Sequence, residues 1–135
     1  MERIKVIITD DNVQYRKLFK ELLKPFAIDL IGEASNGQDL LTLLETLSPD
    51  VILLDIEMPG MDGIVSYKFI KEKYPMAKVV MVSSIDAYEL IQELKERGVK
   101  GFVHKHMLDD EILWTTIKTV KDGGVLYTEI SSSNK

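Results

Sequence analysis

The sequence predicts an α/β domain in which helices cover both faces of a parallel sheet, the arrangement called doubly wound. Short runs of Val, Ile and Leu alternate with longer segments whose apolar residues lie three and four positions apart. The short runs are apolar at nearly every position, which is typical of strands that are buried on both faces. Strands that alternate with helices in this way are joined by right-handed crossovers in a parallel sheet.

Five short apolar runs are the predicted strands. Each run has three to five residues and is followed by polar or turn-forming residues. The runs span residues 4–8, 30–34, 51–54, 79–82 and 101–103.

Five amphipathic segments are the predicted helices, each with one apolar stripe that can pack on a sheet. They span residues 15–24, 37–47, 64–74, 87–97 and 110–121. A proline or glycine follows each segment, where a helix ends easily. These stop signals are Pro25, Pro49, Pro75, Gly98 and Gly123.

The composition limits the classes of function. The chain of 135 residues carries a net charge of −5 and has a pI near 5.1, so it lacks the basic face that nucleic-acid binding requires. It has no cysteine, which excludes disulfides and thiolate metal sites. No secretory signal or membrane-length apolar run is present, so we expect a cytoplasmic protein without membrane contact. We expect one domain over residues 1–125, followed by a tail or the start of a linker over 126–135.

Polar side chains follow four of the predicted strands. In an open parallel sheet, ligands bind outside the carboxyl ends of the strands, so these side chains are candidates for a common site. The residues are Asp10 and Asp11 after the first strand, Asp55 after the third, Ser83 and Ser84 after the fourth, and Lys105 after the fifth.

The charges of this group favour phosphate chemistry. Three neighbouring carboxylates repel one another, and Lys105 offsets only one of the three charges. A divalent cation would balance the rest, and oxygen ligands select a hard ion such as Mg²⁺ or Mn²⁺. Such a metal offsets charge in phosphoryl transfer, and Asp55 beside it could act as the nucleophile.

Each of these residues also has an ordinary structural interpretation. The pair Asp10-Asp11 could cap a helix, Asp55 could be a turn residue, and Ser83-Ser84 could cap the fourth helix. Lys105 alone is typical of a solvated surface lysine. Their joint placement at one edge of the sheet favours function.

The segment of residues 51–63, Val-Ile-Leu-Leu-Asp-Ile-Glu-Met-Pro-Gly-Met-Asp-Gly, resembles the phosphoacceptor segment of bacterial two-component response regulator receiver domains, and Asp10-Asp11 resembles their acidic pair. The resemblance covers about residues 2–125. It implies a flavodoxin-like (CheY-like) sheet of five strands in the order 2-1-3-4-5. It also implies that a sensor histidine kinase phosphorylates Asp55 in the presence of Mg²⁺, so that the protein is a phosphoacceptor switch rather than an enzyme.

The resemblance also assigns roles to individual residues. Asp11 and Asp55 would bind Mg²⁺ directly, Asp10 mostly through water, and the backbone carbonyl of Glu57 would complete the protein ligands.

Three further residues are implied to respond to phosphorylation. Ser83 corresponds to a switch hydroxyl, Lys105 to the lysine that pairs with a phosphoryl oxygen, and Phe102 to a switch aromatic. Phe102 alone could equally be a core aromatic. The surface formed by residues 86–122 would then change its affinity for a partner or a second copy of the chain.

One departure from the family's pattern lies beside Lys105, where His106 replaces the usual proline. That substitution and the segments 31–37, 48–51 and 121–127 resemble the NarL/LuxR-type branch. Its members carry a DNA-binding output domain for transcription regulation, so we expect either a receiver separated from such a domain or a single-domain relay, and we favour the former. His104 and His106 lack a third metal ligand and are interpreted as strand-end histidines.

Two alternative functions stay open from the residues alone. One is a Mg²⁺-dependent hydrolase or phosphotransferase that uses Asp55 as a nucleophile on an external substrate, with Glu57 as the candidate acid–base group. The other is an interaction module of the same fold that is never phosphorylated.

Overall fold

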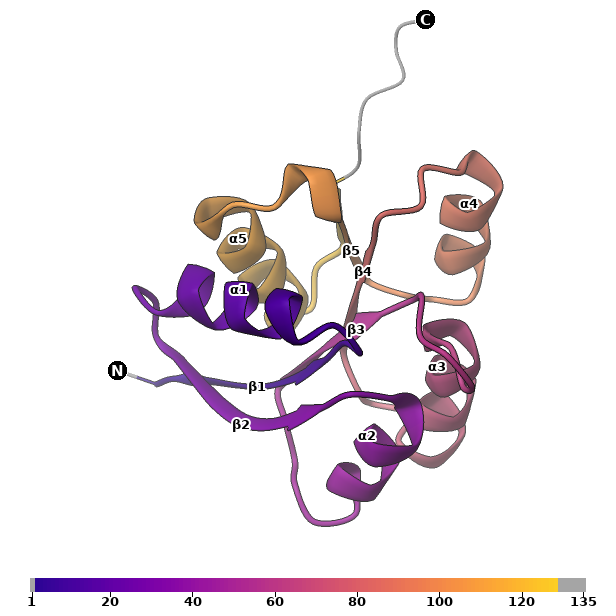
Figure 1. The fold of residues 1–135 in the computed structure, drawn as a ribbon, viewed down its shortest axis with the longest axis horizontal. Helices are drawn as coiled ribbons and strands as arrows, with labels where there is room; N and C mark the ends of the chain where they lie inside the picture. The colour runs from indigo at the N-terminus through magenta and orange to yellow at the C-terminus, as the bar shows by residue number, and fades with distance from the viewer. Residues whose placement is uncertain (1, 129–135) are drawn as a thin grey trace, which may run out of the picture.

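The computed structural model describes residues 2–128 and shows a parallel sheet covered by helices on both faces (Figure 1). The strand order is β2-β1-β3-β4-β5-β6, which confirms the predicted fold class and the order of the first five strands. The elements are β1 (Ile4–Thr9), α1 (Val13–Leu23), β2 (Ile28–Ala34), α2 (Gly37–Leu44), β3 (Val51–Asp55), α3 (Gly63–Lys73), β4 (Val79–Ser83), α4 (Tyr88–Glu96), β5 (Gly101–His104), the 3₁₀ turn Lys105–Met107, α5 (Asp110–Lys121) and β6 (Leu126–Thr128).

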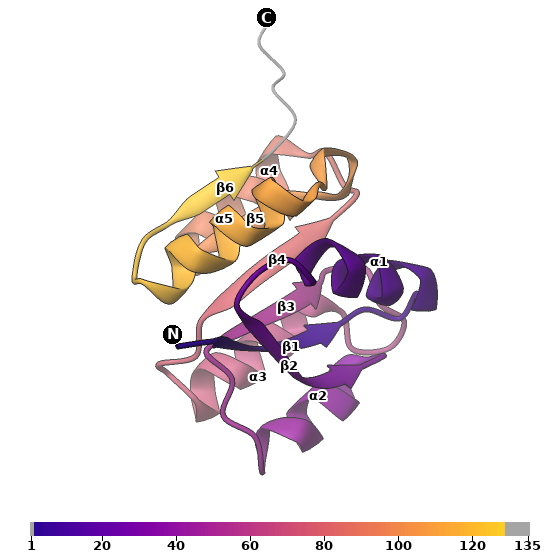
Figure 2. The ribbon, with the colours of Figure 1, turned by 90° about the vertical axis from the view of Figure 1, so that its left-hand side faces the viewer.

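The strand β6 corrects the expectation of five strands. It pairs in parallel with β5 at the edge of the sheet opposite β2, as Figure 2 shows. The Tyr127 ring stacks on Phe102 with 5.9 Å between ring centroids, and its hydroxyl donates to the carbonyl of Val99 over 2.6 Å. The first three residues of the expected tail, 126–128, therefore form a strand. Residues 129–135 lie outside the described residues.

The sheet separates two apolar cores. Alternate strand residues, such as Ile7 and Leu54, pack on one face under α2, α3 and α4. Their neighbours, such as Ile8 and Leu53, pack on the other face under α1 and α5. Because both faces are covered, the central strands are apolar at almost every position, as the sequence pattern indicated.

Polar side chains cap the amino ends of helices that follow the strands. The Asn12 side chain accepts hydrogen bonds from the backbone N–H groups of Gln14 and Tyr15, so Asn12 is the N-cap of α1. The helix α4 is the exception, because its N-cap residue is Ala87 and no side chain caps it. The capping interpretations of Asp10-Asp11 and of Ser83-Ser84 are therefore wrong.

None of the helices within residues 2–128 is long and apolar enough to cross a membrane.

Gly63 brings the start of α3 against the end of β3. Its backbone N–H donates to the carbonyl of Ile56, and a Cβ atom at this position would lie 2.3 Å from the backbone oxygen of Asp55. A real Cβ cannot approach a backbone atom so closely, so a side chain here would displace the loop that follows Asp55. The glycine is needed for a close approach of two backbone segments.

We expect Gly63→Ala to lower the free energy of unfolding by about 1–3 kcal/mol, because the added methyl group overpacks a contact made by backbone atoms. Urea unfolding followed by circular dichroism measures this change. Val65→Ala is the control, because Val65 lies exposed on the same helix and its truncation is expected to change stability by less than about 0.5 kcal/mol. Equal stabilities of Gly63→Ala and the parent would contradict the prediction.

Candidate functional site

Three carboxylates meet at the carboxyl edge of the sheet. Asp10, Asp11 and Asp55 each offer one oxygen atom, and these atoms lie within 4.8 Å of one another. The strands β1 and β3 are neighbours, with Thr9 opposite Leu54, so their ends place Asp10 and Asp55 side by side. Asp10 and Asp55 are 0% and 2% exposed, whereas Asp11 is open to solvent. The predicted acidic group is therefore assembled around two buried charges.

Lys105 pairs with both buried carboxylates. Its Nζ atom lies 3.1 Å from Asp10 Oδ2 and 3.3 Å from Asp55 Oδ1. The same atom lies 3.9 Å from the centroid of the Tyr15 ring, a cation–π contact. The Lys105 side chain is 7% exposed, so the interpretation as a solvated surface lysine is wrong.

Tyr15 and Arg16 are site residues that the sequence analysis missed. Tyr15 covers the Lys105 ammonium group, and Arg16 donates to the backbone oxygen of Asp10 over 2.7 Å. The Arg16 side chain also pairs with Glu33 on β2, so it ties the loop after β1 to the neighbouring strand. Both residues lie in the first turn of the helix that follows Asp10-Asp11, and this position could have identified them as site residues from the sequence.

Burial controls the protonation of the site. Burial raises the pKa of Asp55 from its ordinary 3.8 to about 6, and the negative charge of Asp10 adds to this increase. Lys105 and a backbone hydrogen bond from Glu57 act in the opposite direction. For Lys105, burial tends to lower the pKa, but the charges of Asp55 and Asp10 outweigh burial and raise it. The metal-free site therefore holds more negative charge than its single cation neutralises.

The unsatisfied oxygens of the site fit a hard divalent cation. Apart from their ion pairs with Lys105, the buried Asp10 Oδ2 and Asp55 Oδ1 atoms have no hydrogen-bond donor within residues 2–128. A donor set of carboxylate oxygens, with one member open to solvent, suits Mg²⁺ or Mn²⁺, which keep several water ligands. The residues that would hold the ion are Asp10, Asp11 and Asp55, and the carbonyl of Glu57 stays a prediction.

Glu57 accepts hydrogen bonds from the hydroxyl groups of Ser83, the last residue of β4, and of Ser84, which follows it. Its Oε1 atom accepts from Ser83 Oγ over 3.3 Å, from the Ser84 backbone N–H over 3.3 Å and from Ser84 Oγ over 2.9 Å. Ser83 is 0% exposed, and its Oγ accepts from the backbone N–H of Ile85 over 2.9 Å. Strand β4 lies beside β3, with Val82 opposite Asp55, so Ser83 lies one residue further toward the site edge. The sequence analysis did not foresee this role of the Glu57 side chain.

The remaining candidate residues lie on β5 and in the turn after it. Phe102 is fully buried in the core under α2, α3 and α4. The peptide between Lys105 and His106 is trans. The backbone N–H of His106 donates to His104 Nδ1 over 3.1 Å, which orients the buried His104 ring as a strand-end residue.

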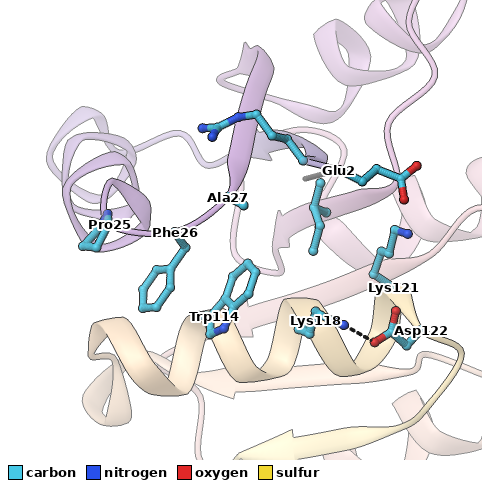
Figure 3. A pocket seen from close by; sticks show the side chains of 10 residues that line it. Glu2, Pro25, Phe26, Ala27, Trp114, Lys118, Lys121 and Asp122 are labelled. Atoms are coloured by element: carbon cyan, nitrogen blue, oxygen red, sulfur yellow. Dashed lines mark hydrogen bonds and ion pairs between the residues drawn. The ribbon is translucent and has the colours of Figure 1, made fainter.

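A cavity of about 580 Å³ lies at the amino ends of the strands, on the side of the sheet opposite the acidic site (Figure 3). It is bordered by the start of β1 at Ile4 and by the stacked rings of Phe26 and Trp114, whose centroids are 4.8 Å apart. The ion pair of Lys118 with Asp122 lines its rim. Since this cavity opens at the amino ends of the strands, a ligand in it would not contact the acidic site.

Sequence comparison identifies relatives of this chain. Residues 6–117 match the family described as response regulator receiver domain. The chain is 36% identical over 124 residues to the transcriptional regulatory protein LnrK of Bacillus subtilis, covering 91% of this chain and 56% of LnrK. It is 31% identical to the chemotaxis protein CheY of Listeria monocytogenes, covering 87% of this chain and 99% of CheY. It is 48% identical to a protein-glutamate methylesterase/protein-glutamine glutaminase of Clostridium acetobutylicum, covering 99% of this chain and 40% of that protein. The chain thus spans about half the length or less of two of these relatives.

Solved structures confirm the fold. The receiver domain of RcsB from Salmonella enterica, determined with the phosphomimetic BeF₃⁻, superimposes with a TM-score of 0.87 at 22% identity and 95% coverage of both chains. The receiver domain of the putative response regulator NarL from Mycobacterium tuberculosis superimposes with a TM-score of 0.84 at 26% identity, covering 91% of this chain and 99% of that one. A relative named NarL is also found by sequence: the chain is 34% identical over 109 residues to the nitrate/nitrite response regulator protein NarL of Escherichia coli, covering 80% of this chain and 50% of that protein.

The raised pKa of Asp55 predicts how stability depends on pH. The folded protein binds this proton more tightly than the unfolded chain, so the free energy of unfolding falls as pH rises from about 4 to about 6 and then levels off. At pH 7.5 without metal, the ionised Asp55 should cost about 2–3 kcal/mol. We therefore expect Asp55→Asn to be more stable than the parent at pH 7.5, with a smaller difference at pH 4.5.

Urea unfolding in EDTA at the two pH values tests this expectation. Asp50→Asn is the control, because it removes a half-buried carboxylate outside the site but keeps an oxygen that can accept the hydrogen bond from the Lys5 backbone N–H. A stability difference between Asp55→Asn and the parent that is the same at both pH values would contradict the assignment.

Proposed function

Because this chain belongs to the response regulator receiver domain family, we propose that it is a phosphorylation-controlled switch of a two-component system in which Asp55 accepts the phosphoryl group. The observation that carries this proposal is the burial of Asp55 against Lys105 and the acidic pair. A buried carboxylate that faces one ammonium group and two further carboxylates has the charge environment of a metal-assisted nucleophile.

Few residues take part in the proposed transfer of the phosphoryl group to Asp55. A carboxylate oxygen of Asp55 forms the bond to phosphorus while the bond from phosphorus to the donor, a histidine of a sensor kinase, breaks. With a pKa near 6, Asp55 is mostly ionised at neutral pH and can attack. Mg²⁺ held by Asp10, Asp11, Asp55 and the Glu57 carbonyl would supply positive charge that stabilises the transferring group.

Lys105 and Ser83 are proposed to bind the new aspartyl phosphate. The Lys105 ammonium already contacts Asp55, so it can pair with a phosphoryl oxygen after a small shift. Ser83 supplies a hydroxyl from the adjacent strand. Its movement would open space that Phe102 can occupy, which changes the surface of α4, β5 and α5. Since β6 pairs with β5 and Tyr127 stacks on Phe102, this strand belongs to the surface that responds.

The relatives support three candidate outputs of the switch. LnrK is a transcriptional regulatory protein, and NarL-type regulators share the fold, so we propose that this receiver controls a DNA-binding output domain and forms a phosphorylation-dependent dimer in the cytoplasm. The 48% identity to a methylesterase supports control of an esterase domain as a second candidate. The match to nearly all of CheY keeps the single-domain relay as an alternative. The receiver itself catalyses only reactions of its own aspartyl phosphate.

We expect the parent protein to form a covalent phosphoryl adduct with acetyl phosphate in the presence of Mg²⁺, and Asp55→Asn to form none, because the amide cannot act as the acceptor. Intact mass spectrometry measures the adduct. Asp50→Asn is the matched control and should be modified like the parent. An adduct on Asp55→Asn of equal yield would show that another group is the acceptor, and its absence from the parent would refute the proposed function.

We also expect the reaction to depend on the carboxylate of Asp11. Asp11→Asn leaves the buried pair intact but removes one charge from the metal ligands, so about ten- to a hundredfold more Mg²⁺ should be needed for half-maximal adduct formation. A magnesium titration of adduct yield measures this shift. An unchanged midpoint would exclude Asp11 from the metal site.

A further inference from the structure

The Glu57 side chain joins the loop after β3 to the loop after β4. One of its oxygens, Oε1, accepts three hydrogen bonds, and all three donors belong to Ser83 and Ser84. Glu57 is exposed, whereas the Ser83 hydroxyl that it contacts is fully buried. The carboxylate therefore reaches from the surface into the edge of the proposed phosphorylation site.

The hydrogen bond from Ser83 to Glu57 uses the only hydrogen of the Ser83 hydroxyl. A serine hydroxyl donates one hydrogen bond, and Ser83 Oγ donates to Glu57 while it accepts from the backbone N–H of Ile85. While that hydrogen bond exists, Ser83 cannot donate to a phosphoryl oxygen on Asp55.

We propose that Glu57 is a positioning residue that holds Ser83 in the resting arrangement and competes with the phosphoryl group for its hydrogen. The inference rests on the proposed function and deepens it. On activation the hydrogen bond from Ser83 to Glu57 breaks and one from Ser83 to a phosphoryl oxygen forms, and no covalent bond changes in this exchange.

The lengths of the two hydroxyl hydrogen bonds to Glu57 indicate which of them breaks first. The bond from Ser84 Oγ is the shortest, at 2.9 Å, and that from Ser83 Oγ is 3.3 Å. Because hydrogen bonds weaken as they lengthen, the Ser83 bond is the more easily exchanged of the two hydroxyl bonds. Glu57 can therefore keep its hold on Ser84 while Ser83 turns, so the competition is a modest bias against the active arrangement.

The test uses BeF₃⁻ with Mg²⁺ as a non-covalent probe of the active state. We expect Glu57→Ala to bind the probe about three- to tenfold more tightly than the parent, because no acceptor then competes for Ser83. Glu57→Gln keeps an acceptor oxygen and should stay nearer to the parent. Glu21→Ala is the charge control, because it removes an exposed glutamate at the far end of α1 and should leave the affinity unchanged. Calorimetry measures these dissociation constants.

Two comparisons separate the hydrogen bond from other effects of the substitution. In a Ser83→Ala background, the gain from Glu57→Ala should disappear, since the group that the two acceptors share is gone. A gain that persists there, or an equal gain in Glu57→Gln and Glu57→Ala, would mean that charge alone acts and would overturn the inference.

The outcome also distinguishes this inference from the proposed function. If the parent binds the probe through Asp55 but Glu57→Ala binds it no more tightly, the inference fails and the proposed function stands. If the parent does not bind the probe, both fail. A spectroscopic check accompanies the titration: in Glu57→Ala the backbone N–H of Ser84 should shift in the nitrogen–proton spectrum, because it loses its acceptor.

Discussion

The two ion pairs of Lys105 with Asp10 and Asp55 are the interactions on which the rest of the site depends. Placing two carboxylates at the buried end of a sheet carries a large desolvation cost, and one ammonium group between them recovers only part of it. Removing Lys105 would leave both carboxylates buried without a counter-charge. The cluster is thus held in a state that favours the arrival of positive charge, as the proposed metal-assisted reaction requires.

The arrangement of the backbone determines where these charged side chains lie. Parallel strands bring the ends of β1, β3 and β5 to one edge, although these ends are far apart in the sequence. Close approach at Gly63 then fixes the chain that follows Asp55, and the cap formed by Asn12 fixes the chain that follows Asp10. The carboxylates are therefore carried by short connections whose backbones are held by these contacts.

The residue pattern predicted the strands, the helices and the acidic group, because burial on two faces and charged residues at strand ends leave a direct trace in the sequence. The order of the strands in the sheet was implied only by the resemblance to receiver domains. The residue pattern failed where an interaction depends on the geometry of distant segments. The strand β6 has three residues, too few for a periodic pattern, and its pairing is favoured by the stacking of Tyr127 on Phe102. The contact of Tyr15 with Lys105 and that of Glu57 with the serines arise only when segments far apart in the sequence meet.

The same contacts explain how a local charge could reach a distant surface. Ser83 ends β4 beside His104 of β5, and Phe102 lies two residues earlier on the same face of β5. On its other side, Phe102 meets Tyr127, which is anchored to the carbonyl of Val99 after α4. Ser83, Phe102 and Tyr127 therefore lie on neighbouring strands between the proposed phosphorylation site and β6, and Phe102 packs in the same core as Ile91 and Leu94 of α4. Because the protein interior is close-packed, a displaced aromatic ring must move its neighbours, and one of these is β6, which within residues 2–128 pairs only with β5.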